Sequence, residues 1–191
     1  EEFFKKEPGY LEKVWEWALE KLNPEIKKSK AEKQRLEKER ERLNDIISIY
    51  ELKKTYEVSE DYLKGLAKEH KLGWLLDWFR SKKYDLRDID GKIIVSFEGE
   101  EGLSRAGEYL DLEIEKTELE LQKPKTAKER EYNRLEEEKI GLKQQKAVVE
   151  YKKNKASNVE ERINLSKALI KIEKEINEKN CNFVFEDYYT S

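Results

Sequence analysis

The chain has 191 residues, of which 43% are charged and 37% are hydrophobic, and its formal net charge is −3. A composition this polar cannot fill a thick globular core, so we expect long helices that share narrow apolar seams. The charge balance of the whole chain gives no sign of nucleic-acid binding. A DNA-binding protein of this composition would depend on a local basic patch.

Several function classes lack the residues that their chemistry needs. Cys181 is the single cysteine, which excludes an internal disulfide framework and favours a reducing, cytoplasmic compartment. There is one histidine, and we find no glycine-rich phosphate loop or nucleophile elbow, so we predict no enzyme, metal or cofactor. No apolar run approaches the roughly 20 residues of a membrane helix, and no signal-peptide pattern is seen, so we expect no membrane partner. The chain starts at Glu1 without any methionine, and we expect it to be a fragment or a trimmed chain.

Residues 1–57 are predicted to form a helical hairpin. A short amphipathic helix follows Pro8-Gly9, and Asn23-Pro24 ends it because proline disfavours helix at the residue before it. A long charged helix is then expected from Glu25 to about Tyr56. Its apolar side chains recur at heptad-like spacing, which is typical of a coiled-coil seam. These seam residues are Leu36, Leu43, Ile46 and Tyr50.

Residues 58–99 are predicted to form a small winged helix-turn-helix unit. Ser59 is a suitable N-cap for a first helix, and Lys71-Leu72-Gly73 separates that helix from a second one. After a basic loop, Asp90-Gly91 predicts a tight turn, and the β-branched and aromatic run from Ile93 to Phe97 predicts a strand. Helix, turn, helix and strand in this order are typical of a winged helix-turn-helix.

Residues 100–180 are predicted to form a second helical hairpin. Helices are expected from Leu103 to Leu121, from Ala127 to about Lys155, and from about Val159 to Asn180. The middle helix has its own heptad seam, made of Leu135, Leu142 and Val149.

Residues 181–191 are predicted to be an extended aromatic tail. Four aromatic residues between Phe183 and Tyr189 are interspersed with Glu186 and Asp187. Such a segment could close this fold as a strand, or it could dock onto a protein partner.

The chain matches itself at a shift of 99 residues, which indicates an internal duplication. Tyr10-Leu11 falls on Tyr109-Leu110, and Arg35-Leu36-Glu37 falls on Arg134-Leu135-Glu136. Each copy is a short helix, a proline turn and a long helix whose narrow apolar stripe needs a partner helix. We expect the two long helices to pack antiparallel, with the winged unit as their connection. We also expect self-association through the charged helices.

Basic side chains are concentrated in the winged unit, whereas the helix after it is strongly acidic. This asymmetry favours phosphate contact by the unit, although lysines in a lysine-rich chain can simply be solvated. Trp74 and Trp78 could stack on single-stranded nucleic acid, but their helical spacing favours a core position. The candidate nucleic-acid-binding residues are Lys71, Arg80, Lys82, Lys83, Arg87 and Lys92.

The stretch from Leu66 to Phe97, LAKEHKLGWLLDWFRSKKYDLRDIDGKIIVSF, together with the following GLSRAGEYLDLEIEKTELELQK, resembles the DNA-binding region of bacteriophage small terminase subunits of the lambdoid type. The runs RLEKERERL (Arg35 to Leu43) and RLEEEKIGL (Arg134 to Leu142) are similar to the charged hairpin of those proteins. The resemblance implies a non-catalytic subunit that oligomerises and delivers viral DNA to a motor in the host cytoplasm. It also implies that Arg80, Lys82, Lys83 and Lys92 contact DNA.

The sequence therefore predicts a mainly α protein, in which long charged, coiled-coil-like helical hairpins carry a small winged helix-turn-helix-like α/β insert. Two functions remain open. The first is a non-enzymatic, oligomerising DNA-binding protein of viral or mobile-element type, with duplex DNA as its partner. The alternative is a structural scaffold or protein-protein adaptor with no nucleic-acid role.

Overall fold

The computed structural model describes residues 10–189, which form seven helices and one two-stranded antiparallel sheet. The expectation of a mainly α protein is confirmed. The elements are α1 (Tyr10–Leu22), α2 (Pro24–Tyr56), α3 (Glu60–Glu69), α4 (Gly73–Ser81), β1 (Lys83–Arg87), β2 (Ile93–Glu98), α5 (Gly99–Leu121), α6 (Ala127–Lys155) and α7 (Val159–Tyr189).

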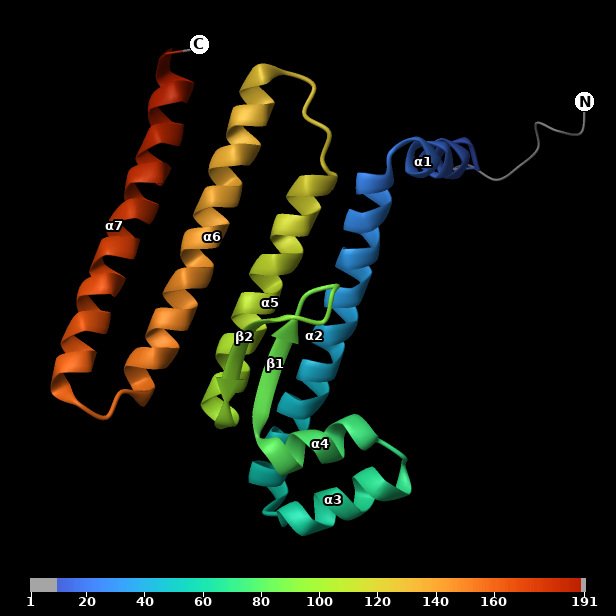
Figure 1. The fold of residues 1–191 in the computed structure, drawn as a ribbon, viewed down its shortest axis with the longest axis vertical. Coiled ribbons are helices and arrows are strands. Elements are labelled where there is room, and N and C mark those ends of the chain that lie inside the picture. Colours follow the sequence, from blue (N-terminus) through green and yellow to red (C-terminus); the bar gives the residue numbers. More distant parts are fainter. Residues whose placement is uncertain (1–9, 190–191) are drawn as a thin grey trace, which may run out of the picture.

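Four long helices make a single layer, in the order α2, α5, α6 and α7, and each runs antiparallel to its neighbour (Figure 1). Helices α3 and α4 lie at the C-terminal end of α2, and the β1–β2 hairpin lies against α2 and α5. Helix α1 leaves the layer at the N-terminal end of α2 (Figure 1). The layer therefore has two open edges, one along α2 and one along α7.

Local capping explains why three of the helices begin where they do. The Asn23 side chain accepts a hydrogen bond from the Glu25 N–H, and Pro24 fills the first position of α2. The Ser59 hydroxyl accepts from the Tyr62 N–H at the start of α3. Thr126 is the N-cap of α6 and accepts from the Glu129 N–H, while the Glu129 carboxylate accepts from the N–H of Lys125, one residue before the cap.

The α2 seam packs into the main core. Leu36, Leu43, Ile46 and Tyr50 are all buried, and Leu43 is 0% exposed. The same helix is joined to α5 by the ion pair between Arg40 and Asp111. The predicted seam of α2 is therefore an internal contact with α5 and the 58–99 unit.

Helix α6 buries two of its faces. The predicted seam faces α7: Leu135 and Leu142 are buried, Val149 is half-buried, and Lys146 pairs with Glu173 of α7. The other face contacts α5, where Gln144 donates a 2.7 Å hydrogen bond to Glu113. These two faces place α6 between α5 and α7.

The expectation that the long helices α2 and α6 pack antiparallel against each other is wrong. Helix α5 separates α2 from α6, and these two helices run in the same direction (Figure 1). The reason lies in the second face of α6, where Ile140, Ala147 and Tyr151 are buried against α5. The residues of α2 that match this face at the 99-residue shift are exposed and mostly polar. They are Glu41, Asp45, Ser48 and Leu52.

The two copies thus differ in tertiary arrangement although their helices end in register. Helices α1 and α5 end 99 residues apart, at Leu22 and Leu121, and α2 and α6 end 99 residues apart, at Tyr56 and Lys155. Helix α1 does not lie along α2, whereas its counterpart α5 lies along α6 (Figure 1). The duplication itself stays a prediction, and residues 1–9 of the first expected hairpin lie outside the described residues.

The expectation of an extended tail is wrong for residues 181–189, which are helical. Helix α7 continues to Tyr189, and residues 190–191 lie outside the described part of the chain. No glycine or proline interrupts the sequence from Val159 to Tyr189, so the backbone hydrogen bonding of the helix can continue. The aromatic composition favoured a strand, but the absence of a helix breaker decided the conformation.

The basic loop before the predicted strand is itself a strand. In β1, Tyr84 and Leu86 are buried while Lys83 and Arg87 are exposed, which is the alternation of a strand with one covered face. Tyr84 pairs with Phe97 of β2, and both side chains lie on the covered face. The Tyr84 hydroxyl donates a 3.0 Å hydrogen bond to Glu39 of α2. Burial and the Glu39 carboxylate raise the pKa of Tyr84.

Candidate functional site

The aromatic residues of the 58–99 unit attach it to the long helices. Trp78 and Phe79 are 4% and 3% exposed, and both rings pack against Tyr50 of α2. Trp74 is half-buried against the same cluster. Trp78 therefore lies in the core, and Trp74 packs against it. Trp78 is too deeply buried to stack on a nucleic-acid base.

Lys82 lies at the end of α4 and connects α2 with α3 through its half-buried side chain. It follows α4 with a φ of 54°, and its ammonium group donates to the Tyr50 hydroxyl at 2.9 Å and pairs with Glu60 at 2.8 Å. Burial lowers the pKa of Lys82, but the bonds to Glu60 and Tyr50 outweigh it, and the pKa is raised overall. The same contact lowers the pKa of Glu60. These two contacts occupy the ammonium group, while the side chain of Lys82 stays 36% exposed.

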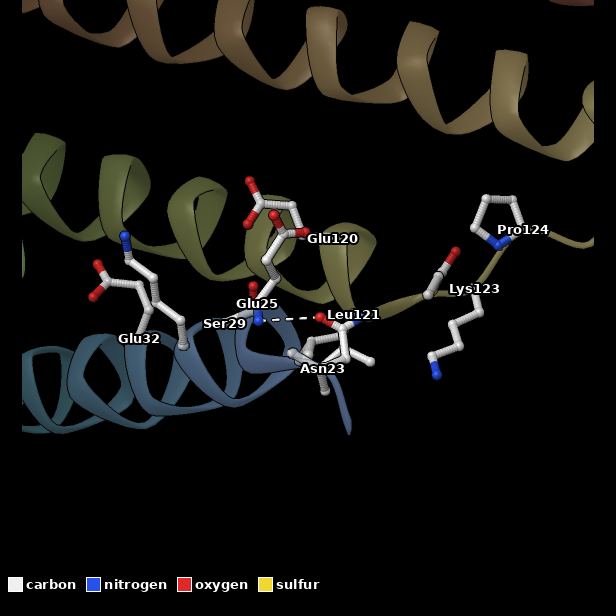
Figure 2. Close-up of a pocket in the computed structure, with 11 residues that line it drawn as sticks. Asn23, Glu25, Ser29, Glu32, Glu120, Leu121, Lys123 and Pro124 are labelled. Carbon is white, nitrogen blue, oxygen red and sulfur yellow. Dashed lines mark hydrogen bonds between the residues drawn. The ribbon is translucent and has the colours of Figure 1, made fainter. Parts of the chain in front are cut away.

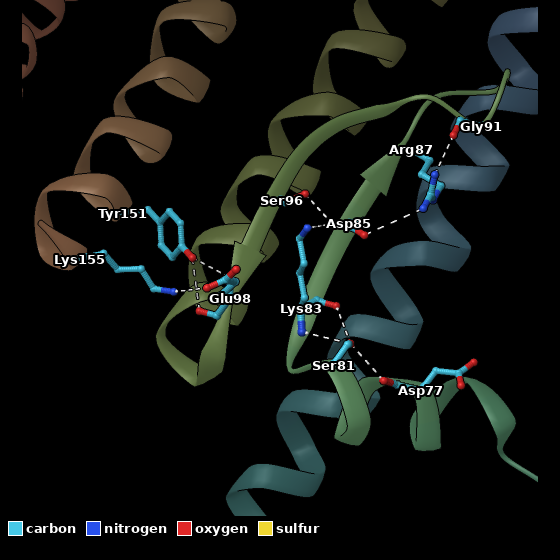
Figure 3. A network of polar contacts seen from close by, with 10 residues as sticks. All are labelled: Asp77, Ser81, Lys83, Asp85, Arg87, Gly91, Ser96, Glu98, Tyr151 and Lys155. Atoms are coloured by element: carbon cyan, nitrogen blue, oxygen red, sulfur yellow. Dashed lines mark hydrogen bonds and ion pairs between the residues drawn. The ribbon is translucent and has the colours of Figure 1, made fainter.

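The outer face of the hairpin carries alternating charges (Figure 3). Asp85 lies between Lys83 and Arg87, with ion-pair distances of 3.7 Å and 4.0 Å, and it accepts a hydrogen bond from Ser96. Arg87 also donates to the Gly91 carbonyl in the hairpin turn at 2.9 Å. Asp85 therefore offsets part of the positive charge on this face.

The remaining candidate nucleic-acid residues are exposed but occupy different parts of the unit. Lys71 lies in the turn between α3 and α4 with a φ of 54°, and Lys92 lies in the turn between β1 and β2. Arg80 is on the exposed side of α4, where it pairs with Asp77 at 3.8 Å. An aspartate on that side of α4 disfavours close approach of a phosphate backbone. The structure thus separates one structural lysine from five exposed basic residues.

The hairpin is also fixed to α6 at the end of β2. The Tyr151 hydroxyl accepts from the Glu98 N–H at 2.6 Å, and Lys155 pairs with the Glu98 carboxylate at 3.2 Å (Figure 3). The ring of Tyr151 also packs edge-on against Phe97. These contacts join the end of β2 to α6.

A groove of about 820 Å³ lies between the N-terminal end of α2 and the C-terminal end of α5 (Figure 2). Ile26, Leu121 and Pro124 give it an apolar part, and Glu32 and Glu120 give it an acidic part. Burial raises the pKa of Glu120, and the neighbouring carboxylates add to this effect. Within residues 10–189, no group of three or more His, Cys, Asp or Glu side chains could hold a metal ion.

Large apolar side chains are exposed at both ends of the helical layer. On α1, Trp15 is 67% exposed and Trp17 is 56% exposed. On α7, the exposed apolar residues are Val159, Ile163 and Ile170. The sequence analysis does not single out the α7 set, because the closer spacing of Leu165, Leu169, Ile172 and Ile176 is the stronger apolar pattern of this helix. The spacing of four and seven residues between Val159, Ile163 and Ile170 was the available signal.

No family model, curated protein or solved structure matches this chain in the comparisons with known proteins. Among the residues that the structure describes, no helix is both long enough and apolar enough to cross a membrane.

Proposed function

We propose that this chain is a non-enzymatic helical scaffold that assembles with further copies of itself. The observation that carries the proposal is the open helical layer, whose edge helix α7 exposes Val159, Ile163 and Ile170 to solvent. Burial of the exposed part of these side chains is favourable and acts against the cost of association, which is roughly 4–15 kcal/mol.

The experiment is a measurement of molar mass against protein concentration, by sedimentation velocity and light scattering. We expect a mass above that of one chain, which rises with concentration. The mass of a single chain at every concentration would contradict the scaffold proposal.

DNA binding is a second candidate function, which is supported by the exposed Arg80, Lys83, Arg87 and Lys92 at the end of α4 and on the hairpin that follows it. In this interpretation residues 58–99 act as a winged helix-turn-helix, and a role like that of a small terminase subunit belongs here. The contacts of Lys82 with Tyr50 and Glu60 and the acidic neighbours Asp77 and Asp85 make it the weaker candidate.

The test of DNA binding is fluorescence anisotropy of a labelled duplex at two salt concentrations. If the hairpin contacts phosphate, Lys83→Glu/Arg87→Glu should weaken binding, and binding should fall as salt rises. Lys27→Glu/Lys28→Glu is the matched control, because it makes the same charge change at the opposite end of α2. Equal weakening by both double variants would assign the binding to non-specific charge, and absence of binding at low salt would exclude this function.

A further inference from the structure

Helix α7 carries two apolar stripes on different sides. Leu165, Leu169, Ile172 and Ile176 make the stripe that faces α6, and Ile172 is 9% exposed. At 3.6 residues per turn, Val159, Ile163 and Ile170 lie roughly 130° around the helix axis from that stripe. These three residues, which we call the outer stripe, are 73%, 49% and 66% exposed. The outer stripe therefore faces away from the layer.

We propose that the outer stripe packs against the same stripe of a second copy, with the two α7 helices antiparallel. This inference rests on the proposed self-association and specifies the surface and orientation that it uses. The four helices of the layer already alternate in direction, and each packs beside the next (Figure 1). An antiparallel second α7 continues that pattern, and a twofold axis between the two helices makes the contact self-complementary.

Charge on the flank of the outer stripe favours a second copy in this orientation. Glu160 lies at the N-terminal end of the stripe, Lys167 lies near its middle, and Lys171 and Lys174 lie towards its C-terminal end on the same flank. All four side chains are exposed. When Ile163 lies opposite Ile170 of the partner subunit, antiparallel packing brings Glu160 to the level of the partner's Lys171 and Lys174. In the antiparallel register the two copies of Lys167 lie at the centre of the contact, and Glu160 is the residue that gains opposite charges. In a parallel twofold pair the same flank of the two helices would lie on opposite sides of the contact, so Glu160 would not meet the lysines of the other copy.

The first test measures the dimer dissociation constant of the full chain by sedimentation. Ile163→Glu/Ile170→Glu should weaken association on the order of 100-fold or more, because two charges would be buried in each half of the contact. The matched control is Ile89→Glu/Ile94→Glu, which makes the same change at exposed isoleucines around the β1–β2 turn. Circular dichroism and thermal melting of each variant would show whether the fold is kept.

Charge reversal tests the orientation. Glu160→Lys alone and Lys171→Glu/Lys174→Glu alone should each weaken association severalfold, and the triple variant should restore it. The triple variant would not restore association if α7 bound a surface other than the α7 of a second copy.

Cys181 offers a direct distance measurement, since it is the single cysteine, is exposed and lies within α7. With spin labels on Cys181, the antiparallel register predicts a separation of about 40 Å or more, from the 1.5 Å rise per residue. A short label distance would overturn the antiparallel arrangement.

The possible failures can be told apart. A single-chain mass at all concentrations would overturn both the scaffold function and this contact. An oligomer that Ile163→Glu/Ile170→Glu leaves intact would keep the scaffold function and overturn the role of the outer stripe.

Discussion

Lys82 is a basic side chain that the fold uses for its own stability. Its ammonium group connects Tyr50 of α2 with Glu60 of α3 and lies 4.9 Å from the ring centre of Phe79. Basic residues next to one another in sequence, such as Lys82 and Lys83, can therefore have unrelated roles. Their side chains leave a helix end and a strand start in different directions.

Lys82→Met keeps the aliphatic stem and removes the charge, and we expect it to lower the free energy of unfolding by about 1–2 kcal/mol. Lys83→Met, at an exposed neighbour, should change it by less than about 0.5 kcal/mol. Urea denaturation measures both values. Equal stability of the two variants would contradict a stabilising role for the contacts of Lys82 with Tyr50 and Glu60.

The Lys82–Glu60 contact also predicts a pH dependence. The pKa of Glu60 is lowered from 4.5, so its contribution is complete above that value and is lost as the pH falls through the folded-state pKa. The pKa of Lys82 is raised from 10.5, so its contribution is complete below that value and is lost as the pH rises through the folded-state pKa. The stability difference between wild type and Lys82→Met should therefore be constant near neutral pH and shrink in acid. A constant difference down to about pH 2 would contradict the role of Glu60.

Gly107 makes room for the Arg40 guanidinium. A Cβ atom at this position would come within 2.6 Å of Arg40 Nη1, while Arg40 is held by Asp111. In most helix interiors, replacing glycine by alanine stabilises by about 1 kcal/mol. We expect this gain for Gly141→Ala in α6, where nothing lies within 4 Å of the added atom. Gly107→Ala should lack the gain or be destabilising, and thermal melting of the two variants would detect the difference.

At the scale of single elements, the apolar spacing of α2 distinguishes its buried side from its exposed side. Leu43 is 0% exposed and Leu52 is 49% exposed, although both are leucines of one helix. Leu43→Ala should destabilise the protein by about 2–5 kcal/mol, because it removes packing and leaves a cavity. Leu52→Ala should cost less than about 1 kcal/mol. Similar losses in urea denaturation would contradict the assigned seam.

The elements themselves were largely predictable from local signals. The start of α3 and the bounds of α6 agree with the sequence prediction, because Ser59, Thr126 and the apolar periodicity act within a few residues. Strand β1 was missed because its charged residues, Lys83, Asp85 and Arg87, hide an alternation that only Tyr84 and Leu86 carry. The end of α7 was not predicted, because its aromatic residues favour a strand. The helix continues because no glycine or proline interrupts it.

At the scale of the whole molecule, α1 is peripheral to the layer. Val14, Trp15, Trp17 and Leu22 are exposed, so these side chains of α1 add little apolar burial to the core. Removing residues 1–22 should therefore shift the Tm by less than about 4 °C, which corresponds to a change of at most about 1 kcal/mol. Tryptophan emission should move to shorter wavelength, because Trp74 and Trp78 remain. A large fall in Tm would show that α1 supports the layer.

The sequence by itself determined the mainly helical class, most helix bounds and the presence of a β-strand before α5. These properties follow from capping, helix breakers and apolar spacing, which act over short distances along the chain. Only the tertiary structure decided that α5 lies between α2 and α6, that Lys82 contacts Tyr50 and Glu60, and that the outer stripe of α7 is exposed. Those outcomes depend on which apolar or charged faces meet in space. The contacts that decide them join residues 30 or more apart in sequence, such as Tyr50 and Lys82.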